Sequence, residues 1–179
     1  MVYVFLAEGF EEVEALAPVD ILRRGGVEVK TVGVAGKTVK GSHGIPVLSD
    51  ITEDEVDFGN IEGVILPGGM PGTLNLEKSD TVISALKFAA DKGRLIGAIC
   101  AAPSILGKAG LLGGRRATCF PGFEKYLTGA VFCDEPAVKD GNIITSYGAG
   151  AAFDFGFLLL AALKGKAAAD ELKYSMKYL

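Results

Sequence analysis

The feature that most constrains the fold of this chain is a repeated alternation of short β-branched runs with amphipathic, helix-forming segments. Strands are predicted at residues 2–6, 27–34, 61–66, 94–99, 117–120 and 142–146. Helices are predicted at residues 11–24, 79–92, 102–109, 151–164 and 170–177. Strands and helices that alternate with short connections form right-handed βαβ units around a mostly parallel sheet that is covered on both faces. The pattern therefore predicts an α/β protein with three layers.

The bulk composition favours one domain over residues 1–179 and excludes several classes of function. The chain has 179 residues, a length typical of one domain, and it contains no repeat and no linker-like stretch. Its net charge is −4 and no basic stripe is present, so we expect no nucleic-acid partner. No apolar run reaches the ~18 residues that a membrane span needs, and the first residues lack the basic region of a secretion signal. Three cysteines without metal-type spacing predict a reduced, cytoplasmic protein with no bound metal.

Cys100 lies where a buried strand is predicted to turn directly into a helix, in the segment IGAICAAPSIL. A side chain in such a turn is exposed above the sheet, and the helix N-terminus behind it supplies unpaired N–H groups and a partial positive charge. Both features favour a thiolate and predict a lowered pKa. Free cysteines are also among the most buried residues, so the residues alone leave a nucleophile and a packed structural cysteine both open. Cys119 and Cys133 lie in apolar, strand-like segments, and we expect structural roles for them.

Two further segments carry residues that can act on a thiol. Gly68 and Gly69 follow a predicted strand, and successive glycines can point their N–H groups together as an oxyanion pocket, although a tight turn also explains them. Glu12 and Glu14 open the first predicted helix, and each lies on an apolar helical face. A carboxyl group buried beside a thiolate has a raised pKa and can donate a hydrogen bond to the sulfur. The helical spacing does not decide between these two glutamates.

His43 is the only histidine, and it lies in a segment, 36–50, that carries turn signals and a possible hairpin. Because it is far from Cys100 in the sequence, a surface position is a better expectation for it than a role as a base. Asp20 and Asp154 lie within predicted helices, where each is expected to pair with an arginine of the first helix.

Four segments together resemble the DJ-1/ThiJ/PfpI family over nearly the full length of the chain: LAEGFEEVEALAPVDILRRGG, VILPGG, GAICAAPSIL and ITSYGAGAAFDFGFLLL. The resemblance implies a flavodoxin-like fold, also described as class I glutamine amidotransferase-like, and a homodimer. It implies that Cys100 is the reactive cysteine and that Glu14, rather than Glu12, is its carboxyl partner. It also implies that Gly69, with the backbone of Ala101, forms an oxyanion-like pocket. We further expect His43 to lie near the partner subunit's Cys100 region.

The departures from the family pattern narrow the expected chemistry. In the peptidase-like branch a histidine directly follows the reactive cysteine, but here the residue is Ala101. Glutamine amidotransferase subunits need a late histidine, and none follows His43. Some members carry a histidine before the proline in the strand after the elbow helix, where this chain has Phe120. A cysteine without a histidine base is a poor peptidase, but it can still attack reactive aldehydes or be oxidised.

The sequence therefore predicts a cysteine-dependent stress-response protein that acts on reactive α-oxoaldehydes or on glycated proteins, as a glyoxalase or deglycase. In this hypothesis Cys100 is the nucleophile, Glu14 is the proton shuttle, and no cofactor is needed. The alternative is a non-enzymatic sensor of oxidative stress, or a chaperone, that works through oxidation of Cys100. An intracellular cysteine peptidase ranks last.

Overall fold

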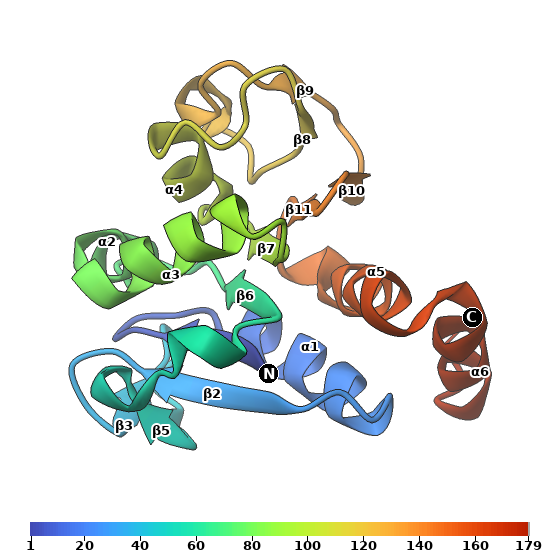
Figure 1. Ribbon diagram of the computed structural model, residues 1–179, viewed down its shortest axis with the longest axis horizontal. Helices are drawn as coiled ribbons and strands as arrows, with labels where there is room; N and C mark the ends of the chain where they lie inside the picture. The colour runs from blue at the N-terminus through green and yellow to red at the C-terminus, as the bar shows by residue number, and fades with distance from the viewer. Residues whose placement is uncertain (179) are drawn as a thin grey trace.

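A seven-stranded sheet runs through the centre of the protein, and its strand order is β10-β11-β7-β6-β1-β2-β5 (Figure 1). The computed structural model describes residues 1–178. The strands of the sheet are β1 (Val2–Leu6), β2 (Val29–Gly33), β5 (Ile51–Thr52), β6 (Gly63–Leu66), β7 (Leu95–Ile99), β10 (Ala137–Asp140) and β11 (Ile143–Ser146). Neighbouring strands are parallel, except that β10 is antiparallel to β11. The predicted α/β architecture with a mostly parallel sheet is confirmed.

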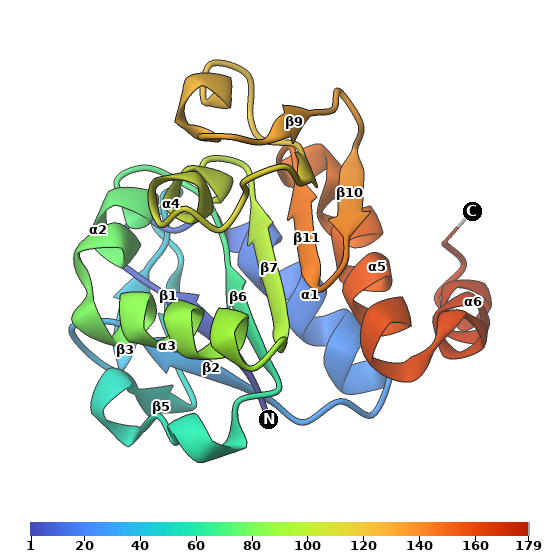
Figure 2. The ribbon, with the colours of Figure 1, turned by 45° about the horizontal axis from the view of Figure 1, so that its top comes forward.

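Helices cover both faces of this sheet (Figure 2). They are α1 (Glu12–Arg24), α2 (Gly72–Lys78), α3 (Asp80–Asp91), α4 (Pro103–Lys108), α5 (Ala152–Lys164) and α6 (Lys166–Ser175). Side chains of α2, α3 and α4 share one hydrophobic cluster with the sheet, and those of α1, α5 and α6 share the other. Short 3₁₀ turns lie at Glu53–Glu55, Phe58–Asn60, Glu124–Tyr126 and Ala149–Ala151.

Strand β1 shows why the apolar runs become central strands. Val2, Val4 and Leu6 pack into the cluster on the α1 side, whereas Tyr3 and Phe5 pack into the cluster on the α3 side. Because successive side chains of a strand point to opposite faces, only a continuous apolar run can satisfy a strand that is buried on both sides. The core therefore consists of two layers, one on each side of the sheet.

Two small strand pairs lie outside the central sheet. β3 (Thr38–Lys40) and β4 (Pro46–Leu48) form an antiparallel hairpin, as residues 36–50 predicted. β8 (Arg116–Ala117) pairs with β9 (Val131–Phe132). The strand predicted at 117–120 is shorter and starts earlier, since the N–H of Phe120 donates to Cys100 O and not to a neighbouring strand.

Several elements differ from those predicted. α2 was not predicted, because its seven residues contain glycine, threonine and asparagine, which are poor helix formers. The short strands β5, β9 and β10 were also missed. α6 begins at Lys166, earlier than the predicted residue 170, and the run of alanines after Gly165 accounts for this start. None of the helices within residues 1–178 has the length and apolar character needed to cross a membrane.

Candidate active site

Cys100 lies at the carboxyl end of β7, in a turn that leads directly into α4. Its φ is +64°, a left-handed conformation that costs a non-glycine residue on the order of 1–3 kcal/mol. Two backbone hydrogen bonds hold the residue there: its N–H donates to Ser146 O at 2.8 Å, and its carbonyl accepts from the N–H of Phe120 at 2.8 Å. The strained turn keeps the half-buried thiol above the end of the sheet.

Glu14 reaches the same place from α1, and only 1% of its surface is exposed. Its Oε2 accepts a hydrogen bond from the N–H of Gly68 at 2.9 Å. A Cβ added to Gly68 would lie 2.6 Å from Cys100 Cβ and 2.7 Å from Glu14 Oε2, so both side chains meet above this glycine. The structure thus brings Cys100, Glu14 and Gly68 together, and Glu12 points elsewhere.

Burial controls the protonation of this pair. It raises the pKa of Glu14 to about 7, against the opposing effect of hydrogen bonds with Cys100 and the Gly68 N–H. It also raises the pKa of Cys100 to about 12, and the charge and hydrogen bond of Glu14 act in the same direction. Hydrogen bonds from the N–H groups of Gly69 and Ala101 lower the pKa of Cys100, but by less. The position of Cys100 at a helix N-terminus predicted a lowered thiol pKa. That prediction is wrong while Glu14 is ionised, because burial and the charge of Glu14 outweigh the N–H groups.

Because the two groups are coupled, loss of the first proton near pH 7 leaves one proton and one negative charge for both of them. The remaining proton can lie on sulfur beside a carboxylate, or on Glu14 beside a thiolate. Only the second arrangement is nucleophilic. In it the thiolate faces the N–H groups of Gly69 and Ala101, which favour negative charge.

The turn after β6 can present the Gly69 N–H to the sulfur only because Gly68 and Gly69 have no side chains. Gly69 has a φ of +87°, and a Cβ on it would lie 2.4 Å from the backbone nitrogen of Glu11. The carbonyl of Gly68 accepts from that same Glu11 N–H at 3.0 Å. The start of α1 and the glycine turn are therefore packed backbone to backbone beside Cys100.

Phe120 and Gly148 form a further wall of the site. A Cβ on Gly148 would lie 3.3 Å from Phe120 Cδ2 and 4.0 Å from Glu14 Oε1. Phe120 was singled out in the sequence as the residue at a position where some relatives carry histidine, but Gly148 was missed. The signal for Gly148 was the segment SYGAG, which directly follows the strand end at Ser146.

Glu12 belongs to a separate cluster with Glu11 and His43, in which one ligand atom from each residue lies within 4.8 Å of the others. Glu12 Oε1 accepts the N–H of His43 at 2.9 Å, and Oε2 lies 3.0 Å from His43 Nδ1. Burial alone would raise the pKa of Glu12, but these bonds and one from the Ile45 N–H lower it to about 2. The same contact raises the pKa of the exposed His43. Since these groups already satisfy one another, we interpret the cluster as a tether between α1 and the hairpin loop.

Four other residues of interest lie outside the site. Cys119 is buried as expected, whereas Cys133 is half-buried and contacts the Arg116 guanidinium, so the expected apolar surroundings of Cys133 are only partly observed. Asp20 pairs with Arg24 at 2.7 Å, as predicted. Asp154 does not pair with an arginine: it accepts a hydrogen bond from Tyr178 at 2.6 Å.

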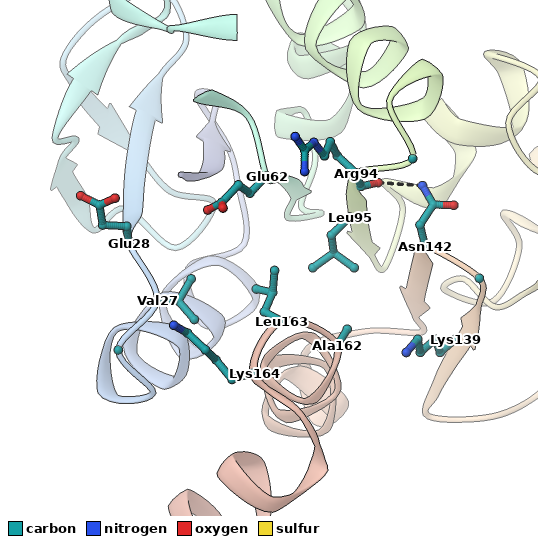
Figure 3. Close-up of a pocket in the computed structure, with 13 residues that line it drawn as sticks. Val27, Glu28, Glu62, Arg94, Leu95, Lys139, Asn142, Ala162, Leu163 and Lys164 are labelled. Carbon is teal, nitrogen blue, oxygen red and sulfur yellow. Dashed lines mark hydrogen bonds between the residues drawn. The ribbon is translucent and has the colours of Figure 1, made fainter. Parts of the chain in front are cut away.

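A cavity of about 580 Å³ lies at the other end of the sheet, where the parallel strands begin (Figure 3). Val27, Leu95 and Leu163 line its apolar part. Charged side chains of both signs surround these residues: Glu28, Glu62, Arg94, Lys139 and Lys164. No cysteine, serine or threonine is among the residues that line the cavity, and in open α/β sheets ligands bind at the carboxyl ends of the strands. The cluster around Cys100 is therefore the better candidate for an active site.

The sequence model of the DJ-1/PfpI family matches residues 1–162. The chain belongs to this family. It is 37% identical to Protein dj-1beta of Drosophila melanogaster over 172 residues, which cover 94% of this chain and 92% of that protein. It is 33% identical to the glutathione-independent glyoxalase DJR-1.2 of Caenorhabditis elegans over 160 residues, which cover 88% of this chain and 85% of that protein.

Solved structures of DJ-1 superfamily proteins share the fold. A mutant of STM1931 from Salmonella typhimurium has a TM-score of 0.94 at 39% identity, covering 99% of this chain and 98% of its own. Oxidised DJ-1 from Toxoplasma gondii also has a TM-score of 0.94, at 31% identity, covering 99% of this chain and 97% of its own. The DJ-1 fold and family that the four sequence segments implied are thus confirmed.

Proposed function

We propose that this DJ-1 family member is a cofactor-independent, glyoxalase-type enzyme that converts α-oxoaldehydes, free or as adducts on protein amino groups, into 2-hydroxy acids. The observation that carries the proposal is the meeting of Cys100 and Glu14 above Gly68, with the N–H groups of Gly69 and Ala101 facing the sulfur. The glyoxalase relative from C. elegans supports this reaction class. A nucleophile, a proton carrier with a pKa near 7 and two oxyanion donors are what the reaction requires.

The proposed reaction needs only water besides the aldehyde. Cys100 sulfur bonds to the aldehyde carbon, and the carbonyl oxygen takes the proton that Glu14 holds. Glu14, now a carboxylate, removes the hydrogen from that carbon and returns it to the neighbouring carbon of the resulting enediolate. The hydroxyl proton moves to the oxygen of that neighbouring carbon, which gives a thioester and leaves Glu14 ionised. Water then cleaves the thioester, which releases the 2-hydroxy acid and returns the proton to the Cys100–Glu14 pair.

The test is lactate formation from methylglyoxal by the purified protein and by Cys100→Ser. Cys133→Ser is the matched control, because it removes another half-buried thiol that lies outside the site. We expect turnover by the wild type and by the control, and none by Cys100→Ser. Equal lactate formation by all three, or formation by none, would reject the proposal.

An oxidation sensor is the second candidate, because the two N–H groups that can hold an oxyanion can also hold the oxygens of an oxidised sulfur. The T. gondii relative was solved in an oxidised form. The test is mass spectrometry after mild peroxide treatment. A selective gain of two oxygens on Cys100 in a protein without turnover would favour the sensor, and random oxidation of the three cysteines would reject it. A peptidase remains the least favoured function, because Ala101 provides no base.

We also propose that the protein is a cytoplasmic homodimer. Large apolar side chains are exposed on α1, on the neighbouring hairpin and on α5, which packs against α1: Val13, Leu16, Ile45, Leu48 and Phe153. Self-association would bury this surface, with His43 close to it, and the expected contribution of His43 to the partner subunit's site remains a prediction. Leu16→Asp should yield a monomer in analytical ultracentrifugation, and an unchanged mass would contradict the dimer.

A further inference from the structure

Phe120 is an exposed aromatic side chain whose backbone is fixed to the candidate nucleophile. About half of its surface is exposed, at 47%, although it follows buried residues. Its N–H donates to Cys100 O at 2.8 Å, and its own carbonyl accepts the N–H of Phe123 at 3.1 Å. The chain on both sides of the ring is therefore held, and the ring keeps its place beside the site.

The ring lies across Gly148 from the carboxyl group of Glu14. The position of a Gly148 Cβ is 3.3 Å from Phe120 Cδ2, 3.8 Å from Phe120 Cε2 and 4.0 Å from Glu14 Oε1. With a φ of 162°, the Gly148 backbone is extended, which any residue can adopt. Glycine is therefore not needed here for its backbone freedom. Its effect is to leave room between the ring and the carboxyl group.

We propose that Phe120, together with the space over Gly148, binds the substituent of the aldehyde and makes the enzyme selective for aromatic α-oxoaldehydes over small ones. The inference rests on the function proposed above and adds the substrate class. A substrate carbonyl held between Cys100 and the N–H groups of Gly69 and Ala101 can direct its substituent over Gly148 to the exposed face of the ring. Neither Phe120 nor Gly148 has a polar side chain that could bind a polar substituent.

The expected size of the preference follows from the contact. An aromatic pair gains about 0.5–1.5 kcal/mol beyond the burial of its area, which corresponds to roughly 2- to 13-fold in affinity. A methyl substituent covers little of the ring and gains almost none of this. Phenylglyoxal should therefore have the higher kcat/KM, mainly through a lower KM.

The experiment compares kcat/KM for phenylglyoxal and methylglyoxal in the wild type, Phe120→Ala and Phe132→Ala. Phe132 is a matched control because it is similarly exposed, at 44%. It lies on β9, which pairs with β8, the short strand that precedes Phe120 in the chain. We expect the ratio of the two values to fall about 3- to 10-fold in Phe120→Ala and to stay unchanged in the control. Gly148→Ala, which fills the gap, should lower the ratio as well. An unchanged ratio in Phe120→Ala would overturn the proposal, and a general loss of folded enzyme cancels in a ratio.

A second measurement separates this proposal from the proposed function. Cys100 is alkylated with iodoacetamide in the presence of mandelate or lactate, the 2-hydroxy acids from the two aldehydes. We expect mandelate to protect at lower concentration in the wild type, and this advantage to disappear in Phe120→Ala. If neither aldehyde is turned over but the advantage is seen, the catalytic function fails and the aromatic site stands. Equal protection by both acids would overturn the aromatic site whatever the activity.

Discussion

The substitution Gly68→Ala tests the geometry of the candidate site most directly. The new methyl group would lie 2.6 Å from Cys100 Cβ, 2.7 Å from Glu14 Oε2 and 3.0 Å from the carbonyl oxygen of Ile99. Side-chain rotation relieves only the contact with the carboxylate, because the other two atoms are fixed to the backbone of β7 and its turn. Either Glu14 is pushed away from the thiol, or the glycine turn and β7 separate.

Both outcomes have a size that can be predicted. Overpacking by one methyl group in a tightly packed place costs about 1–3 kcal/mol of unfolding free energy. For a protein of this length each kcal/mol lowers Tm by about 2–4 °C, so Tm should fall by roughly 2–12 °C. Displacement of a catalytic group by about 1 Å can reduce the rate by about 100-fold. We therefore expect the loss of turnover to exceed by far what partial unfolding at the assay temperature explains.

The assay combines thermal unfolding with lactate formation from methylglyoxal. Gly150→Ala is the control, since a Cβ there meets nothing within 4 Å, and it should keep both Tm and activity. A Gly68→Ala protein with the Tm and turnover of the wild type would refute the claim that thiol and carboxyl meet above this glycine. A lowered Tm with full turnover would leave the contact in place and refute only its role in catalysis.

Three further predictions follow from the titrating groups. Glu14 has a pKa near 7 in the folded protein against 4.5 for an ordinary glutamate, so between these pH values the folded state binds more protons than the unfolded state. The unfolding free energy should therefore decrease by up to about 3 kcal/mol as the pH rises through this window, and urea unfolding of Glu14→Gln should lack this slope. Glu12 has a pKa of about 2, so its stabilising effect is complete above pH 4.5 and is lost as the pH falls toward 2. Glu12→Gln should therefore lower the unfolding free energy by about 1–3 kcal/mol at pH 7 and by little at pH 2.5. Equal losses of unfolding free energy at both pH values would contradict the tether. Because the pKa of His43 is raised, protonated His43 stabilises the hairpin contact at low pH, and this stabilisation is lost as the pH rises through the folded pKa. NMR titration should give His43 a higher pKa in the wild type than in Glu12→Gln. Identical pKa values in the two proteins would exclude the contact.

The sequence predicted the sheet and its coverage because periodic apolar runs report burial directly. Residues 2–6 and 95–99 are apolar without interruption, and each became a central strand. α2 and the paired strands β8 and β9 were missed or misplaced because their few residues carry no period, and contacts with distant segments decide their conformation. Phe120 shows this most clearly, since its N–H bonds to the turn at Cys100 and the chain leaves the strand that its residues favour.

The candidate site was predictable in its residue types but not in its electrostatics. The position of Cys100 followed from a strand that turns into a helix, and the choice of Glu14 over Glu12 needed the family resemblance. Helical spacing could not choose, since the partners of the two carboxylates, Gly68 and His43, lie in loops remote in the sequence. The sign of the pKa shift at Cys100 was missed because it depends on burial and on the charge of Glu14, neither of which a local motif contains.

The turn at Cys100 holds the backbone of this residue in hydrogen bonds while it leaves the side chain accessible to solvent. Its amide is bonded to the end of β11 and its carbonyl to Phe120, so three segments must part before the peptide group meets solvent. The sulfur, in contrast, is partly exposed in the native state. Amide hydrogen exchange at this residue should therefore report global unfolding, while thiol reagents react without any opening. At Cys100, amide exchange therefore measures the unfolding of the whole protein, whereas thiol reactivity measures the chemistry of the native site.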